Sequence, residues 1–408
     1  MKTSRDSLAN GRALLPFVFL ALAATASLQA QQPPELLVRC ATLVIAPDTV
    51  ISPGEMLVRD GKVAQLGSEI PPEARARATI VAFDRATIVP GFVLAHSTLG
   101  QEQDLAERAV ALTPDLLAAD AFDPAGAMLR QLPEHGFTSC ALAPSSTNVA
   151  GGIAALVEPG VGGKDSQSMG SLRLEQIYAK FSLIAASRNP ERQPTSLMGA
   201  VDLLRNAFGE AKSGTLTGPE AVALAAVARG ERRAVVHADT RAEILAALAL
   251  CKELGIEPVI AGANEASDCI QEIVAARAAV ILPPLRPELR DEMLTLPARF
   301  EARGVAFCFA GSPRLTRSSA ALAVQHGCSK KTALAALART PAELCGVAAT
   351  HGSLRRGCDA DFVVFDGDPL DLGSRLLAVY GDGQLLFGAA GACATKPNEP
   401  APKSKETL

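Results

Sequence analysis

The sequence has few aromatic residues and little excess charge. Of its 408 residues only 4% are aromatic, with no tryptophan, and the formal net charge is −4. A surface that binds nucleic acid needs an excess of lysine and arginine to neutralise phosphates, so we expect no nucleic acid partner. Hydrophobic residues make up 48% of the chain, which excludes a disordered protein and predicts a globular one.

Long apolar runs are also lacking, except near the N-terminus. Beyond residue 30 no stretch approaches the roughly 18 apolar residues that cross a bilayer. Within the first 30 residues, three basic residues precede an apolar run over residues 14–26. This pattern predicts a secretory signal peptide over residues 1–30, with an uncleaved anchor as the alternative, although Pro16 interrupts the run. We therefore expect a secreted or periplasmic protein with no stable membrane span after signal removal.

The nine cysteines form no recognisable framework. Their number is odd, they are scattered along the chain, and no CxxC pair or Cys/His cluster occurs. Most lie in apolar contexts, as Cys308 does between Phe307 and Phe309. We therefore expect small buried side chains rather than a disulfide scaffold.

The middle of the chain alternates between strand-like and helical patterns. Apolar runs of strand length alternate with Ala/Leu-rich stretches of helical spacing. The apolar runs cover residues 92–95, 137–142, 234–237, 258–261, 279–282 and 305–309, and the main helical stretches cover residues 124–132, 219–229, 241–254 and 265–278. Such alternation predicts a parallel sheet with helical crossovers, and so many units in series favour a closed (β/α) barrel.

One of these units shows the pattern completely. Residues 233–237 form a buried strand, Thr240 and Glu243 form a capping box, and Gly255 ends the helix that follows. His237 is thereby predicted at the carboxyl end of its strand. Barrel enzymes keep their chemistry at that end.

Both ends of the chain are rich in strand patterns. Asp60-Gly61 predicts a hairpin near the N-terminus, and Asp382-Gly383 marks a turn between strands over residues 376–387. We expect residues 36–90 and roughly 355–390 to form one small sheet domain. Residues beyond 393 are rich in Pro, Lys and Glu and are predicted to be disordered.

Several segments match motifs of one known family. Residues 88–100 read IVPGFVLAHSTLG, residues 340–347 read TPAELCGV, and residues 352–370 read GSLRRGCDADFVVFDGDPL. The first is similar to the PGFIDAHxHxG strand of the amidohydrolase superfamily, and the other two resemble its TxNPAxxLG and GSLxxGxDADLVVFDGDPL segments. Residues 235–239, VVHAD, resemble its fifth barrel strand. The resemblance is closest to the imidazolonepropionase-like branch.

The resemblance implies an α/β fold, namely a distorted (β/α)8 TIM-type barrel plus a small β-sandwich domain built from both chain ends. The domain boundaries that follow are residues 31–90 for the N-terminal part of the sandwich and 91–350 for the barrel. Residues 351–393 form its C-terminal part, and 394–408 form a disordered tail.

The resemblance also implies a metal centre, but this chain departs from the family's ligand set. The family uses an HxH pair on strand 1, a lysine or glutamate on strand 4, histidines on strands 5 and 6, and an aspartate on strand 8. Here His96 is followed by Thr98, and His237 is retained. The candidate strand 4 segment, around residues 172–183, contains Lys180, and the sequence does not fix its register. The strand 6 segment offers Asn264 and Glu265 but no histidine, and Ser312 stands in the strand 8 segment.

The expected function follows from these departures. The resemblance implies a hydrolase of non-peptide, cyclic amide C–N bonds by ancestry, and we expect a weakly active or inactive barrel, a pseudoenzyme, that retains small-ligand binding at its mouth. Thr98, Asn264 and Ser312 are the ligand-binding candidates. The alternative is an active enzyme with one metal, zinc, on His96 and His237. The weak candidates for its base are Asp239 and Glu265. A structural role of the outer helices is a third class, without specific support.

Two further groups of polar residues have ordinary structural interpretations. His351 precedes Gly352 and is expected to be a solvated turn residue. The aspartates between residues 359 and 368 alternate in sequence, so we expect them to diverge and to serve turns and sheet edges. Residues 148–152 with 160–163 resemble the family's substrate-covering loop.

Overall fold

The structure is a computed structural model that describes residues 35–161 and 169–389. The predicted signal peptide, the predicted C-terminal tail and Cys393 lie outside the described residues. Among those that are described, no helix has both the length and the apolar character needed to cross a membrane. All eight cysteines in this part of the chain are buried and free, which confirms their interpretation as small core side chains.

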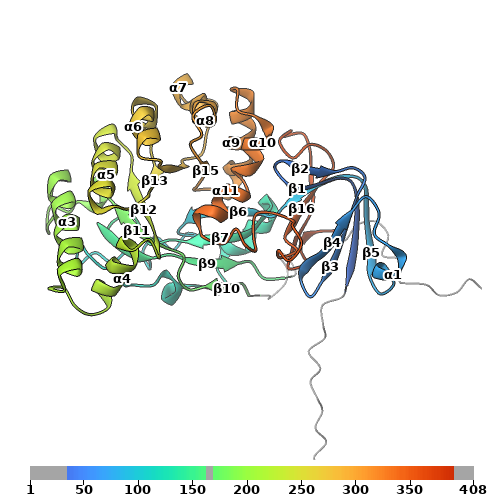
Figure 1. The fold of residues 1–408 in the computed structure, drawn as a ribbon, viewed down its shortest axis with the longest axis horizontal. Helices are drawn as coiled ribbons and strands as arrows, with labels where there is room; N and C mark the ends of the chain where they lie inside the picture. Colours follow the sequence, from blue (N-terminus) through green and yellow to red (C-terminus); the bar gives the residue numbers. More distant parts are fainter. Residues whose placement is uncertain (1–34, 162–168, 390–408) are drawn as a thin grey trace, which may run out of the picture. The chain divides into compact units, whose positions relative to one another are not determined.

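Strands from both ends of the chain form one sheet (Figure 1). Its order is β18-β17-β16-β5-β1-β3-β4, with β2 paired to β1. Strand β5 joins the two ends, because it runs parallel to β1 and antiparallel to β16, where Phe362 is opposite Pro90. The shared ladder confirms the expected sheet. Its strands are β1 (Leu36–Ala46), β2 (Thr49–Ile51), β3 (Gly54–Arg59), β4 (Lys62–Gly67), β5 (Thr79–Pro90), β16 (Phe362–Phe365), β17 (Leu376–Gly381) and β18 (Gln384–Gly388).

Both predicted hairpin turns are present. Asp60 and Gly61 have φ values of 51° and 74°, and Asp382 and Gly383 have values of 49° and 70°. Two consecutive residues with positive φ define the turn whose twist matches that of paired strands, which is why Asp-Gly is favoured there. The first turn joins β3 to β4 and the second joins β17 to β18.

The remaining strands form two sheets. One has the order β10-β9-β7-β6, and the other has the order β15-β14-β13-β12-β11-β8. Strands β11 to β15 are mutually parallel, as are β6 and β7, whereas β8 and β9 run antiparallel to their neighbours. The strands are β6 (Phe92–Ser97), β7 (Phe137–Leu142), β8 (Ala150–Ile153), β9 (Ala155–Glu158), β10 (Ser171–Leu174), β11 (Tyr178–Ser182), β12 (Arg233–Ala238), β13 (Pro258–Gly262), β14 (Ala279–Leu282) and β15 (Phe307–Phe309).

The combined strand order is consistent with a TIM-type barrel. Strands β8 and β9 are consecutive in the chain, and they pair with β11 and β7 respectively, which links the two sheets. No ladder joins β15 to β6 within the described ranges; there the backbone N–H of Gly311 donates to the carbonyl oxygen of His96 at 3.5 Å. A closed ring and a β-sandwich therefore stay predictions.

Strand β8 corrects the expectation of a loop at residues 148–152. Gly152 has a φ of 119°, and a Cβ atom there would clash with the carbonyl oxygen of Leu116. The glycines thus allow close backbone approach within a strand, which the sequence pattern does not distinguish from a loop.

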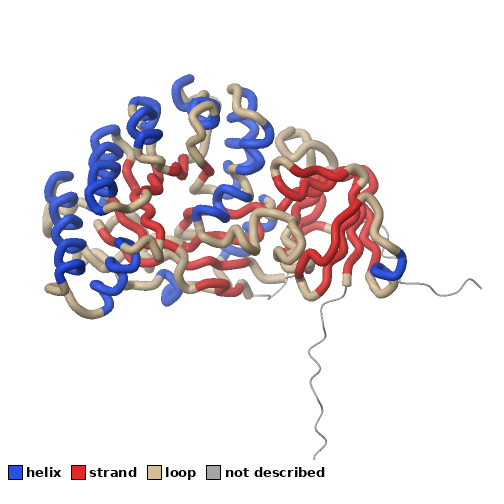
Figure 2. Tube along the Cα trace, in the orientation of Figure 1, coloured by secondary structure: helices blue, strands red, loops and turns tan. Residues whose placement is uncertain are grey.

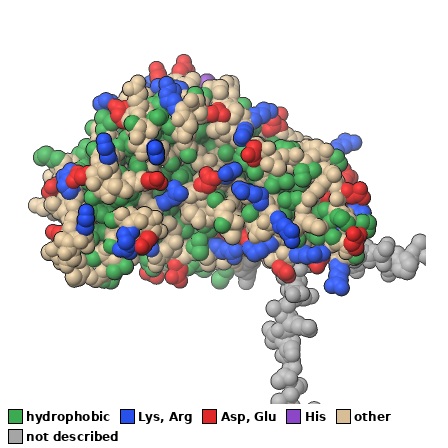
Figure 3. All heavy atoms as spheres, viewed as in Figure 1, with side chains coloured by type: hydrophobic (Ala, Val, Ile, Leu, Met, Phe, Trp, Pro, Cys, Tyr) green, Lys and Arg blue, Asp and Glu red, His purple; other side chains and the backbone are tan. Residues whose placement is uncertain are grey.

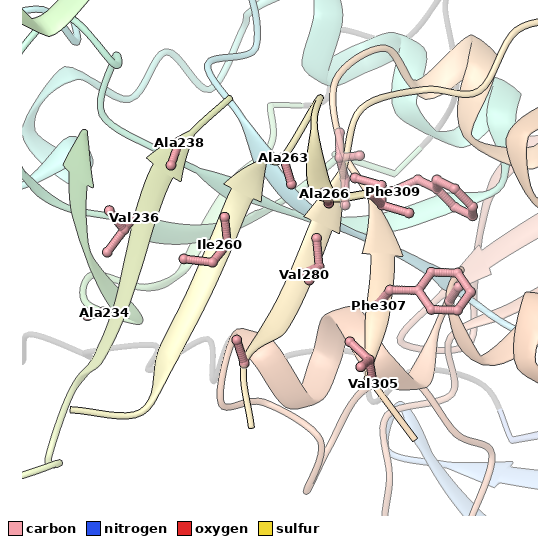
Figure 4. Close-up of a cluster of buried hydrophobic side chains, with 14 of the residues drawn as sticks. Ala234, Val236, Ala238, Ile260, Ala263, Ala266, Val280, Val305, Phe307 and Phe309 are labelled. Carbon is pink, nitrogen blue, oxygen red and sulfur yellow. The ribbon is translucent and has the colours of Figure 1, made fainter. Parts of the chain in front are cut away.

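Helices cover the outer side of β11 to β15 (Figures 1 and 2). Side chains such as Val236, Ile260 and Phe307 point from alternate strand positions into this layer (Figure 4). The predicted capping box of Thr240 and Glu243 begins α5, and Gly255 ends it. The helices are α1 (Pro72–Arg75), α2 (Ala127–Gln131), α3 (Leu197–Ser213), α4 (Pro219–Ala228), α5 (Arg241–Leu254), α6 (Ile270–Ala275), α7 (Asp291–Leu294), α8 (Leu296–Glu301), α9 (Pro313–Gln325), α10 (Lys330–Ala335) and α11 (Arg339–Leu344).

The opposite faces of these strands form a second core made largely of small residues. Ala261 and Cys308 of these strands belong to it, β6 and β7 contribute Ala95 and Ala141, and α11 adds Ala342. Because this interior is filled, ligands can reach only the strand ends. On the outer face shown in Figure 3, acidic and basic side chains are interspersed, as expected from the small net charge.

Candidate active site

A serine hydroxyl lies between a buried lysine and a histidine at the carboxyl ends of the parallel strands. Ser146 Oγ is 2.6 Å from Lys180 Nζ and 2.6 Å from His237 Nδ1. Lys180 is only 1% exposed, whereas Ser146 and His237 are half-buried. The cluster therefore joins a buried cation to two groups that solvent can reach.

Adjacent strands position these side chains. In the parallel pair of β11 and β12, Lys180 lies opposite Val235 and Ser182 lies opposite His237. Residues two apart on a strand share a face, so Lys180 and His237 both project toward the face of Val235, which belongs to the inner core. Ser146 lies in the segment that follows β7.

The hydrogen-bonding capacity of each group indicates which atoms donate and which accept in this cluster. Lys180 donates to Ser146 Oγ, so the serine's own proton is available to His237 Nδ1 when that nitrogen carries no hydrogen. The other ring nitrogen, Nε2, lies 3.5 Å from Asp239 Oδ1, which favours a proton on Nε2. Asn264 donates to the same carboxylate oxygen at 2.7 Å. The chain of contacts runs from Lys180 through Ser146 and His237 to Asp239.

His96 has a separate partner. Its Nδ1 is 3.1 Å from the hydroxyl of Tyr178, and that hydroxyl donates to the carbonyl oxygen of Ala95 at 2.9 Å. Since the tyrosine has only one proton to give, it accepts from His96 Nδ1–H, which leaves His96 Nε2 with a lone pair. The β6–β7 ladder shifts register between Leu94 and Ser97, so His96 leaves the regular alternation of its strand.

Burial dominates the electrostatics of the cluster. It lowers the pKa of Lys180 to about 7, although the negative charge of Asp239 acts in the opposite direction. Burial, followed by the charges of Lys180 and His237, lowers the pKa of His96 well below its usual value. His96 is therefore neutral at physiological pH, and a substantial fraction of Lys180 is uncharged.

The predicted site residues fall into two groups. His237, Lys180, Asp239 and Asn264 belong to one connected set, whereas three others have unrelated partners. The hydroxyl of Thr98 donates to Glu102 at 2.6 Å, Glu265 accepts the backbone N–H of Arg241 at the start of α5, and the carbonyl oxygen of Ser312, which precedes α9, accepts from Thr316.

Sequence reasoning missed Ser146 and Tyr178. Ser146 lies in a Ser-Ser-Thr run that follows a predicted strand, and no motif distinguishes it from an ordinary loop serine. The one usable signal was its place after the carboxyl end of a strand. Tyr178 is one of two tyrosines, and nothing in the sequence predicted its contact with His96.

The expectation of a solvated His351 is wrong. This side chain is 2% exposed, and its Nε2 lies 3.1 Å from Glu158. Burial acts to lower the pKa of His351, but the hydrogen bond to Glu158 and the nearby carboxylates of Asp361 and Asp359 outweigh it and raise the pKa. Two of the aspartates expected to diverge thus converge on one histidine, because β9 and the loop before β16 meet there.

The donor set does not fit the metal centre that the family resemblance implies. A catalytic zinc generally needs about three nitrogen, oxygen or sulfur ligands from the protein. Both ring nitrogens of His237 already face Ser146 and Asp239, which leaves His96 Nε2 as the free imidazole donor. Within the described ranges, no group of three His, Cys, Asp or Glu side chains is placed to hold a metal ion.

Comparisons with known proteins bear on this geometry. No protein-family model matches the chain. Amidohydrolase tasK of Hapsidospora irregularis is 24% identical over 82% of the chain, and N-acetylglucosamine-6-phosphate deacetylase of Rattus norvegicus is 38% identical over 22% of it. The matches span only 40% and 22% of the length of these two curated relatives.

Solved structures show the same fold. An amidohydrolase from Thermotoga maritima has a TM-score of 0.75 at 24% identity, covering 87% of this chain and 100% of that one. A β-aspartyl dipeptidase from Fervidobacterium islandicum has a TM-score of 0.55 at 12% identity, with coverages of 87% and 97%. The fold is that of amidohydrolases. The chain is thus similar in sequence and in fold to proteins named amidohydrolases.

Proposed function

We propose that this protein is an amidohydrolase-type barrel of the imidazolonepropionase-like branch in which the metal centre is degenerate. Its ancestral activity is the hydrolysis of non-peptide C–N bonds, such as those of cyclic amides. Metal-dependent hydrolysis is weak or absent, and the mouth of the barrel binds a small molecule.

One observation carries the proposal. Positions that would hold metal ligands are occupied by groups that bond to one another or to other partners. His237 contacts Ser146 and Asp239, and Thr98 donates to Glu102. The remaining lone pair on His96 Nε2 suits the N–H group of a bound amide, which would explain why the mouth keeps a neutral, half-buried histidine.

Metal content and ligand binding test the proposal directly. Protein purified without chelators is expected to contain less than about a tenth of an equivalent of zinc. Cyclic amides such as hydantoin and dihydrouracil should raise the melting temperature, and His96→Ala should remove that shift. His326→Ala, at the end of α9, is the matched control and should leave it intact.

Two outcomes would contradict the proposal. Stoichiometric zinc with zinc-dependent turnover of a cyclic amide would establish the alternative enzyme with one metal on His96 and His237. A melting temperature that no cyclic amide changes, in wild type or variants, would mean that the mouth is not a site for such ligands.

We also propose that the protein is exported. The basic N-terminal residues and the apolar run over residues 14–26 support this. Fractionation of cells that express the full chain should place it outside the cytoplasm. Recovery of the intact N-terminus from the cytoplasm would refute it.

A further inference from the structure

We infer that Ser146 is a nucleophile toward small acyl compounds, with His237 as its base and Lys180 as the donor that orients the serine hydroxyl. The inference rests on the proposed function in one respect, that ligands bind at the barrel mouth. It differs from the ancestral activity in the proposed function because the reaction at Ser146 needs no metal. The substrate class is an ester or an activated amide whose leaving group is cationic.

The contacts of Ser146 carry the argument. An ordinary loop serine is solvated or bonds to nearby backbone. This hydroxyl instead lies 2.6 Å from a histidine nitrogen that accepts its proton when the ring carries its hydrogen on Nε2, and 2.6 Å from a lysine that donates to the same oxygen. Asp239 then lies 3.5 Å from the far ring nitrogen of His237. Nucleophile, base and orienting carboxylate thus follow in the order that serine hydrolases require.

Lys180 is buried, and the one hydrogen bond of its ammonium group within the described residues goes to Ser146. It projects from β11 among apolar residues, and no described carboxylate lies within ion-pair distance of its Nζ. A buried ammonium without a paired carboxylate is costly. Orienting the hydroxyl of Ser146 for attack is a function that would offset this cost.

Unsatisfied hydroxyl groups lie beside the cluster. Ser182 is fully buried, shares the face of β11 with Lys180, and its Oγ has no hydrogen-bond partner among the described residues. The Oγ1 of Thr147, next to Ser146, is also buried and unpartnered in the same part of the chain. Buried polar groups are normally bonded, so two such donors beside a nucleophile suit the oxygen atoms of an acyl substrate.

The chemical step balances with water as the only co-reactant. Ser146 Oγ attacks the carbonyl carbon as its proton passes to His237 Nδ1. The tetrahedral intermediate collapses, the bond to the leaving nitrogen or oxygen breaks, and His237 returns the proton to that atom. Water then attacks the acyl-serine, gives a proton to His237, and releases the acid with regeneration of the hydroxyl.

The preferred leaving group follows from a neighbouring cleft. A cleft of about 430 Å³ is lined by Pro144 and Gly151, which flank Ser146 in sequence, and by the segment around Leu105. The backbone N–H of Ser145 donates to the carbonyl oxygen of Leu105 at 2.9 Å, so the cleft adjoins the serine loop. Its charged lining residues are all acidic: Asp104, Glu107 and Asp120. A cationic group is therefore favoured there.

Covalent labelling tests the nucleophile. Full-length protein in EDTA is treated with a fluorophosphonate, and separately with p-nitrophenyl acetate, and the modified residue is located by peptide mass spectrometry. One label on Ser146 is expected. Ser146→Ala should abolish it, whereas the matched control Ser145→Ala should retain it. His237→Ala should slow labelling by about 100-fold or more, the usual contribution of a general base.

The cationic preference is tested with a matched ester pair. Acetylcholine should be cleaved faster than its uncharged analogue 3,3-dimethylbutyl acetate, and the preference should fall with added salt and in Glu107→Gln. Equal rates for the two esters would overturn the leaving-group assignment.

Failure of this inference is distinguishable from failure of the proposed function. If Ser146 stays unlabelled while cyclic amides still bind in a manner that depends on His96, the mouth is a binding site and the nucleophile assignment is wrong. Labelling at residues other than Ser146, unchanged in Ser146→Ala, would also overturn it.

Discussion

At the scale of single residues, one glycine leaves the space in which two side chains of the candidate site meet. Gly262 ends β13 with a φ of 86°, and a Cβ atom there would lie 2.6 Å from His237 Nε2 and would clash with Asp239 Oδ1. The absence of a side chain at this position allows the carboxylate to face the imidazole. The contact therefore depends on a neighbouring strand as well as on the two residues that make it.

We predict that Gly262→Ala separates His237 from Asp239. Positive φ and the clash should together destabilise the protein by about 1–3 kcal/mol in denaturant unfolding, and labelling of Ser146 should slow. Gly255→Ala is the control, since Gly255 has a φ of 71° but a Cβ atom added there would meet no atom within 4 Å. The Gly255→Ala variant should be less stable than wild type, but its Ser146 should be labelled at the wild-type rate. Equal reactivity of both variants and wild type would contradict the prediction.

The lowered pKa of Lys180 predicts that the free energy of unfolding depends on pH. Its pKa is lowered from 10.5 to about 7, so between these values the unfolded chain binds more protons than the folded one. The free energy of unfolding should therefore rise with pH across this window, and below it the full cost of the buried ammonium is present. Lys180→Met should be more stable than wild type at about pH 6, and the difference should shrink by about pH 9.

The measurement for Lys180→Met is the urea midpoint at both pH values. Lys252→Met, at an exposed position of α5, is the matched control and should show no such trend. A difference between Lys180→Met and wild type that stays constant with pH would show that the lysine is not held in a lowered pKa.

At the scale of elements, a carboxylate in the β17–β18 hairpin predicts a second pH dependence of the free energy of unfolding. Burial, with Asp361, Glu158 and Asp359 nearby, raises the pKa of Asp382 to about 6, while Arg173 acts to lower it. The folded state therefore binds more protons than the unfolded one between about pH 4 and 6, and the stability from this group falls as pH rises through that range. Above it the ionised carboxylate is destabilising.

We predict that Asp382→Asn is stabilising at pH 7.5 and much less so at about pH 4. Asparagine tolerates the positive φ of this position, so the turn itself is preserved. Thermal melts at both pH values measure the effect, and Asp366→Asn, a carboxylate paired with Arg375 on the surface, is the control. A gain in melting temperature of equal size at both pH values would show that the effect comes from the turn and not from the pKa of Asp382.

At the scale of the whole molecule, the sheet depends on two distant parts of the chain. Strand β16 covers residues Thr87 to Pro90 of β5 and brings Val363 and Phe365 into the main core. We predict that a chain ending at residue 360 fails to fold, because the edge of β5 and its apolar neighbours become exposed. A chain ending at residue 389 keeps every described element and should melt like the full protein. Cooperative melting of the shorter chain, followed by circular dichroism, would contradict this.

The sequence by itself determined the local elements. The Asp-Gly hairpins, the capping box of Thr240 and Glu243 and the alternating strands and helices were all predictable, because each depends on residues close together in the chain. The strand end that carries His237 was predictable for the same reason. The resemblance to amidohydrolases added the expected fold and predicted which positions depart from that family's metal ligands.

Only the tertiary structure decided which side chains meet. Ser146 and His237 are 91 positions apart, and their contact depends on the register of β11 with β12 and on the course of the loop after β7. The convergence of Glu158 on His351 likewise joins residues 193 positions apart. Local patterns contain no information about such distances, because they arise from the packing of strands whose partners lie far away in the sequence. For that reason the sequence predicted a site with few metal ligands, and only the fold showed that Ser146 lies between Lys180 and His237.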